Sequence, residues 1–306
     1  MDVGLLARTL IQLYGMMALG FVLAKAKILD DHVNRKLSAM VVTAVYPMML
    51  LCSMMGQPGD RLEALALLGA GFGMYIAMIL FGKAAGWLLR VPPEKRREFE
   101  CLMVFGNTGF IGAPLAQSLY GDAAFFQMTL LNFAYYFFYN TYAVSTLSPD
   151  TGEKRKFRLK DLMTPGFVMT LLAVVLYLVS FDAPPIVSDM LYMVGSMTTP
   201  LSMIILGSSL AMYPFLQSIT DPWSYVYCGA KLLILPAITF FLCRLLQVNA
   251  YFGDLAVLSN AMPAGSMVLM LALQMKRDSG FISRSIFVST LLSALSLPIL
   301  AILFLH

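Results

Sequence analysis

The stretch FGNTGFIGAPLAQSLYG, residues 105–121, decides how this sequence can fold. Three glycines recur at every third position, an asparagine and a threonine lie between them, and Pro114 follows two residues after the last glycine. Each of these residue types weakens a helix. Long apolar runs nevertheless surround the stretch on both sides. The fold therefore has to account for weak helix formers in the middle of an apolar segment.

The composition is that of a membrane protein. Of the 306 residues, 59% are hydrophobic and 12% are charged, whereas a soluble protein carries about 25% charged residues. Apolar segments of about 20 residues, the length of a bilayer span, follow one another along the chain. The net charge of +4 comes mainly from basic residues between these segments, so it does not indicate nucleic acid binding. We therefore predict an all-α polytopic membrane protein.

The distribution of basic residues predicts the orientation of the spans. Sixteen of the 21 Lys and Arg residues fall on one side of the predicted membrane, three fall on the other, and two lie inside spans. Because Lys and Arg accumulate in cytoplasmic loops, both termini are predicted to lie outside the cytoplasm. The membrane is predicted to be the cytoplasmic (inner) membrane. The ten predicted transmembrane helices are 5–24, 36–56, 62–90, 99–120, 123–147, 165–181, 189–212, 222–246, 251–275 and 282–304.

The longest polar connection divides these spans into two equal sets. We predict a first five-helix repeat over 1–147, a cytoplasmic linker over 148–164 and a second five-helix repeat over 165–306. Because five is odd, the second repeat runs inverted to the first, as in many secondary transporters.

Paired prolines support this repeat. Pro47 and Pro200 lie 153 residues apart in corresponding spans, and Pro114 and Pro263 lie 149 residues apart in spans four and nine. With fifteen prolines in the chain, some matching offsets also arise by chance, and this remains the alternative.

Proline breaks in spans four and nine would explain why weak helix formers lie inside an apolar segment. Unpaired backbone groups inside a membrane are tolerated where they line a wet cavity or are buried in protein. Breaks in corresponding spans of two inverted halves indicate a transport site. The half-helices that start after Pro114 and Pro263 would present free N–H groups, and with them partial positive charge, to an anion.

The motif G-N-x-G-x-x-G-x-P, met at Gly106, Asn107, Gly109, Gly112 and Pro114, resembles the auxin efflux carrier family, which includes bacterial malate and malonate permease-like proteins. The resemblance covers the whole chain, and the short central loop matches bacterial members. It implies that spans four and nine cross at their prolines, as in the bile-acid sodium symporters. It also implies a scaffold of spans 1, 2, 6 and 7 and a moving transport domain of spans 3–5 and 8–10, an elevator arrangement.

Residues at the two breaks are the first candidates for substrate binding. They are Asn107, Thr108, Gly109, Pro114, Ser259, Asn260 and Pro263. The polar side chains among them would bind substrate or hold the crossing open. The alternative is hydrogen bonding between spans, which Asn and Ser also provide in membranes.

A second group of candidates lies in span five. Asn132, Tyr136 and Asn140 are four residues apart and therefore share one helix face. This face is interpreted as a cavity wall, with plain packing between spans as the alternative.

Two lysines lie inside spans. Lys83 is close enough to the cytoplasmic end to extend its amine to water. Lys231 lies about 13 Å into span eight at helical rise, which makes it a candidate counter-charge for an anion. We expect no cofactor, because the sequence shows no metal-ligand spacing and no nucleophile–base pair.

These features predict a secondary transporter that exports a small organic anion, such as an auxin-like or dicarboxylate solute, across the cytoplasmic membrane without obligatory sodium. The alternatives are a membrane sensor or scaffold of the same fold, a sodium- or proton-coupled symporter and, least supported, an intramembrane enzyme. The expected partners are the organic anion and the lipid bilayer, and the scaffold helices would offer a surface for a homodimer.

Overall fold

The computed structural model describes residues 3–55, 61–148, 163, 165–181, 183–212 and 220–304, and these residues form helices with a single isolated β-bridge. The predicted linker 148–164 lies almost wholly outside the described residues. The helices are α1 (Val3–Lys25), α2 (Asp31–Met40), α3 (Tyr46–Met54), α4 (Arg61–Leu88), α5 (Pro93–Val104), α6 (Ala113–Tyr120), α7 (Asp122–Leu131), α8 (Ala134–Phe138), α9 (Val144–Leu147), α10 (Pro165–Leu178), α11 (Pro185–Gly195), α12 (Thr198–Met212), α14 (Pro222–Gly229), α15 (Leu235–Leu245), α16 (Ala250–Asn260), α17 (Ser266–Gln274) and α18 (Gly280–Phe304). Four wider π turns join some of them: η1 (Val41–Val45), η2 (Thr108–Gly112), η3 (Tyr139–Ala143) and η5 (Ala230–Ile234).

The described helices confirm a multi-pass membrane protein. Five continuous helical runs are long and apolar enough to cross a bilayer, and they are Asp31–Met54, Arg61–Leu88, Pro185–Met212, Pro222–Leu245 and Gly280–Phe304. Two shorter apolar helical stretches, Ile11–Lys25 and Phe167–Leu178, fall in the first and sixth predicted spans. The remaining predicted spans, 99–120, 123–147 and 251–275, are divided into shorter helices. The count of ten spans and the inverted repeat stay predictions.

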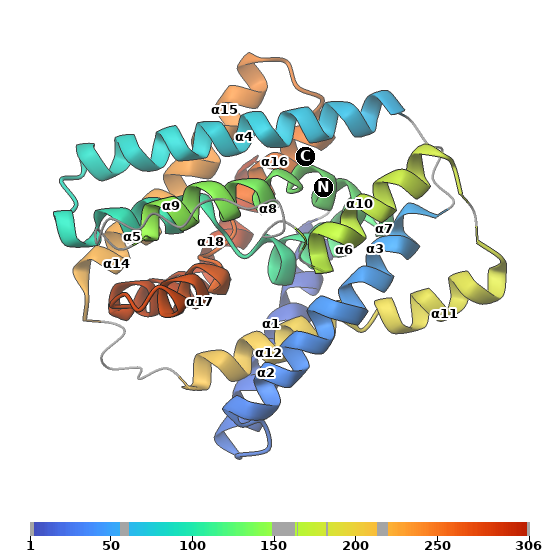
Figure 1. The fold of residues 1–306 in the computed structure, drawn as a ribbon, viewed down its shortest axis with the longest axis horizontal. Coiled ribbons are helices and arrows are strands. Elements are labelled where there is room, and N and C mark those ends of the chain that lie inside the picture. The colour runs from blue at the N-terminus through green and yellow to red at the C-terminus, as the bar shows by residue number, and fades with distance from the viewer. Residues whose placement is uncertain are drawn as a thin grey trace.

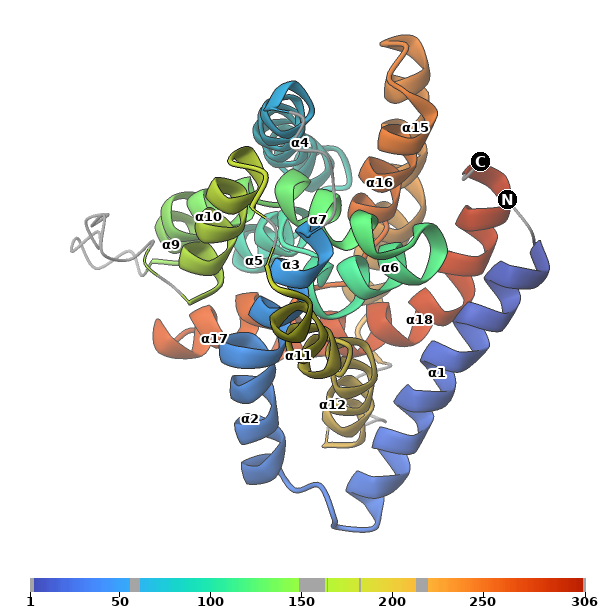
Figure 2. The same cartoon turned by 90° about the vertical axis from the view of Figure 1, so that its right-hand side faces the viewer.

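Two helix groups lie on opposite sides of the molecule. On one side, α12 lies between α1 and α2 (Figure 2). The helix α3 contacts α10 and α11 (Figure 1). The backbones of α1 and α12 approach so closely that a Cβ on Gly20 or Gly207 would collide with a carbonyl of the other helix. On the opposite side, α4 packs on α5 and α7, and α15 packs on α16. The first and last described residues lie near each other in both views.

Three of the described π turns end two residues before a proline, namely Pro47, Pro114 and Pro236. In a regular helix a proline ring clashes with the carbonyl four residues earlier. In these turns the hydrogen bonds reach back five residues, as from the Ala113 N–H to the Thr108 oxygen. This wider turn accommodates the proline ring, so these prolines lie inside continuous helical runs.

The prediction that Pro114 breaks the fourth span is therefore wrong in its position. Pro114 lies in the first turn of α6, and the interruption comes earlier, between the end of α5 at Val104 and the start of η2 at Thr108. The second interruption does contain its proline, because α16 ends at Asn260 and α17 begins at Ser266.

The two interruptions pair with each other like short antiparallel strands. The Asn107 N–H donates to the Pro263 oxygen at 2.7 Å, and the Gly265 N–H donates to the Phe105 oxygen at 2.9 Å. A bridge between Gly106 and Ala264 lies between these two bonds. A Cβ on Gly265 would approach the Gly106 oxygen to 2.9 Å, so this pairing requires a glycine there. The interrupted helices thus cross, and their broken ends are joined by backbone hydrogen bonds.

Candidate functional site

A cavity of about 180 Å³ opens beside the paired interruptions. It is lined by η1 and the start of α3, by the interruption and π turn before α6, by α7 and α8 with the adjoining η3, and by the start of α17. The lining residues are Val41, Val42, Tyr46, Gly106, Asn107, Thr108, Gly109, Phe110, Ala113, Met128, Thr129, Asn132, Tyr135, Tyr136, Tyr139, Asn140, Gly265, Ser266 and Met267. None of these side chains carries a charge at neutral pH.

Six of the eleven predicted site residues line this cavity: Asn107, Thr108, Gly109, Asn132, Tyr136 and Asn140. The other five, Pro114, Ser259, Asn260, Pro263 and Lys231, do not. Pro263 lies directly behind the cavity, since its oxygen accepts the Asn107 N–H. Ser259 is one contact removed, because its hydroxyl donates to the Asn132 side chain. The Asn260 side chain points elsewhere and donates to the Thr239 hydroxyl.

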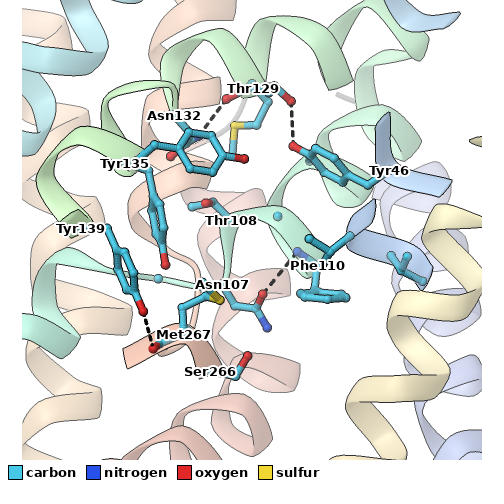
Figure 3. A pocket seen from close by; sticks show the side chains of 18 of the residues that line it. Tyr46, Asn107, Thr108, Phe110, Thr129, Asn132, Tyr135, Tyr139, Ser266 and Met267 are labelled. Carbon is cyan, nitrogen blue, oxygen red and sulfur yellow. Dashed lines mark hydrogen bonds between the residues drawn. The ribbon is translucent and has the colours of Figure 1, made fainter. Parts of the chain in front are cut away.

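Asn107 starts the half-helix that follows the first interruption. Its Oδ1 accepts a hydrogen bond from the Phe110 N–H at 3.3 Å, the arrangement of an N-cap (Figure 3). Its own backbone N–H donates a hydrogen bond to the Pro263 oxygen. Asn107 therefore joins the pairing of the interruptions to the positive end of a helix, at the wall of the cavity.

Asn132 holds three elements together at the cavity wall. Its Oδ1 accepts from the Tyr75 hydroxyl in α4 and from the Ser259 hydroxyl in α16, each at 2.9 Å. Its Nδ2 donates to the Met128 oxygen at 2.8 Å. All three residues that bond to this amide have less than a tenth of their surface exposed. The Asn132 side chain is thus largely committed to structure, and its contribution to the cavity is to fix the wall.

Aromatic rings form two facing walls of the cavity. Tyr135 and Tyr139 lie on one side, and Tyr46 and Phe110 lie on the other, with Thr108 and Asn107 between them (Figure 3). The Tyr135 and Tyr139 rings stack with their centroids 5.7 Å apart. The Tyr139 hydroxyl donates to the Met267 oxygen at the start of α17. Aromatic side chains therefore line the cavity on both sides.

Tyr46 connects the two helix groups across the cavity. Its hydroxyl lies 3.0 Å from the Thr129 hydroxyl in α7. The Thr129 hydroxyl donates its only proton to the Phe125 oxygen, so Tyr46 is the donor of the bond between α3 and α7.

Lys231 lies away from the cavity. It is fully buried in η5, and its Nζ donates to the Met103 oxygen near the end of α5 at 2.8 Å. Lys83 lies with its Nζ 5.5 Å from the centroid of the Tyr142 ring. Within the part of the chain that the structure describes, no group of three or more His, Cys, Asp or Glu residues could hold a metal ion.

The geometry defines a class of protein: a multi-pass membrane protein with a small cavity at two interrupted, paired helices. The chain belongs to the membrane transport protein family, whose model matches residues 5–301. This confirms the predicted likeness to the auxin efflux carriers. An uncharacterized transporter of Methanocaldococcus jannaschii is 24% identical over 217 residues, which cover 68% of each chain. An uncharacterized transporter of Methanothermobacter thermautotrophicus is 21% identical over 299 residues, covering 95% of this chain and 96% of that protein.

Several lining residues were not among those predicted from the sequence. Val41, Val42 and Tyr46 reach the cavity from the second predicted span, although only Pro47 drew attention to that region. Ser266 and Met267 directly follow the second interruption, so a search of the first turn after each break would have found them.

Proposed function

We propose that this protein is a secondary transporter of a small organic anion, and that the cavity at the paired interruptions binds the solute. The observation that carries this proposal is the combination of uncharged lining side chains with two helix starts, at Asn107 and at Ser266, beside the cavity. The free N–H groups at helix starts bind anions without a basic side chain.

The cavity also supports a preference for size and shape. Ligand pockets commonly have volumes of about 300 Å³ or more, so 180 Å³ suits a solute with few heavy atoms. The tyrosine rings favour a flat apolar body, while Asn107 and the helix starts would receive a carboxylate. A monocarboxylate with an aromatic or short apolar body is the solute that these walls fit best.

We further propose that the solute moves by alternating access of two units within an inverted-repeat fold. The scaffold would contain α1, α2, α3, α10, α11 and α12, and the transport unit would contain the remaining described helices. The cavity is lined from both units, because η1 and α3 face α7 and η2 across it. Sliding of one unit against the other would therefore carry the solute past a fixed wall. From the distribution of basic residues, we propose that the protein lies in the inner membrane with both termini outside the cytoplasm.

Coupling to sodium is not required in this proposal, because none of the described residues that line the cavity is a carboxylate. An inside-negative membrane potential would itself drive the anion outward, and a proton could travel on the solute.

Binding and flux measurements on purified protein test this function. The binding panel contains three acid–amide pairs: benzoate and benzamide, malonate and malonamide, and indole-3-acetate and indole-3-acetamide. We expect an acid to bind more tightly than its amide. In liposomes, we expect efflux of that acid to follow the imposed potential with or without sodium. Strict sodium dependence, or a preference for amides or cations, would overturn the proposal.

A further inference from the structure

The buried amine of Lys231 lies at an end of α5 that has lost its normal hydrogen bond. In an uninterrupted helix, the Met103 oxygen would accept the N–H of Asn107, four residues later. That N–H is instead donated to the Pro263 oxygen across the crossing. The Lys231 Nζ supplies the missing donor at 2.8 Å.

A neighbouring side chain serves the preceding carbonyl in the same way. The Tyr227 hydroxyl, one helical turn before Lys231, donates to the Leu102 oxygen at 3.1 Å. Both side chains are fully buried. The two residues differ in one respect that matters for the site, because Lys231 can bring a positive charge and Tyr227 brings none.

Four helix ends meet at the crossing. The starts of η2 and α17 carry partial positive charge, and the ends of α5 and α16 carry partial negative charge. The two negative ends weaken the positive potential that the helix starts give the cavity. A lysine ammonium on the end of α5 strengthens that potential, because it offsets one of the two negative ends.

We infer that Lys231 is a positioning residue that makes the crossing selective for anions, by placing its ammonium group on the broken end of α5. This inference rests on the proposed function, since it assigns the charge that an anionic solute would meet. Lys231 does not touch the solute, and it acts through the α5 end, which leads directly to Gly106 and Asn107 in the cavity wall.

The test compares affinities for the three acid–amide pairs in the wild-type protein and in variants at Lys231. K231Q keeps a donor for the Met103 oxygen but removes the charge, and K231R keeps the charge. We expect K231Q to lose about fivefold to thirtyfold of the preference for acid over amide, the range of a charge at a partly buried helix end. K231R should keep most of the preference. Y227F is the matched control, because it removes the Leu102 hydrogen bond without a change of charge, and it should keep the preference.

The possible results separate this inference from the proposed function. A wild-type protein without preference for any acid overturns both. A wild-type preference that K231Q retains in full overturns only the role of Lys231. If K231Q does not fold, the wild-type protein labelled with ¹⁵N-lysine supplies a second measurement, with K231R assigning the signal. A Lys231 nitrogen with the chemical shift of a neutral amine at neutral pH would overturn the inference, and an ammonium shift would support it.

Discussion

The hydrogen bond between Tyr46 and Thr129 provides a quantitative test of movement between the two units. The variant Y46F removes one hydroxyl group and nothing else from the cavity wall. The Thr129 hydroxyl keeps its bond to the Phe125 oxygen, so the substitution leaves no buried donor without a partner. The change therefore reports the loss of one bond between α3 and α7.

The expected size of the effect follows from measured hydrogen bonds between membrane helices. They contribute about 0.6 kcal/mol on average and about 1.7 kcal/mol at most. If the bond exists only in the arrangement described here, Y46F should lower the population of this arrangement relative to its alternative by about threefold, and by at most about eighteenfold. The direction is fixed, because the bond stabilises the arrangement that contains it.

Distances between spin labels on the two units would measure this population ratio. Met193 in α11 and Leu245 in α15 are both largely exposed and suit labelling after replacement of the four free cysteines. Y139F is the matched control, since it removes a tyrosine hydroxyl that bonds to Met267 within the transport unit. A Y46F ratio equal to that of the wild type, or an equal shift in Y139F, would refute the reasoning.

Three further outcomes are expected. Cysteines placed at 154–160 should react with membrane-impermeant reagents only from the cytoplasmic side, and efficient labelling from outside intact cells would rule out the ten-span topology. P263A should reduce transport at least tenfold with little loss of folded protein, because the proline ring keeps α16 from extending through the crossing. P114A should reduce transport less, and equal losses in the two variants would contradict the assignment of the break. G207A should destabilise the protein by about 1–3 kcal/mol through overpacking. G15A, with no neighbouring atom near its added Cβ, should not lower the melting temperature, because alanine is the better helix former.

The sequence predicted those parts of the site that depend on local chemistry. Glycine and proline weaken helices wherever they occur, so the two interruptions could be located to within one or two turns. The spacing of Asn132, Tyr136 and Asn140 predicted one face, and all three residues line the cavity. The position of the first break could not be predicted, because the π turn that accommodates Pro114 depends on hydrogen bonds five residues apart.

The parts that depend on packing between distant segments could not be predicted. Hydropathy places Lys231 deep in a span but does not say which helix its amine meets, and its partner Met103 is 128 residues away. Tyr46 reads as one aromatic residue in an apolar run, and it becomes a site residue only because α3 faces α7.

The π turn at η1 holds one residue more than a regular helical turn. Val41 and Tyr46 both line the cavity although they are five residues apart, and in a regular helix they would point about 140° away from each other. Loss of a single residue between them would leave a spacing of four, at which a regular helix directs both side chains to one face, but it would also set the Pro47 ring against the carbonyl four residues before it. Among relatives of this chain, a one-residue gap ahead of such a proline would therefore mark a helix that is kinked at the proline behind the same cavity face.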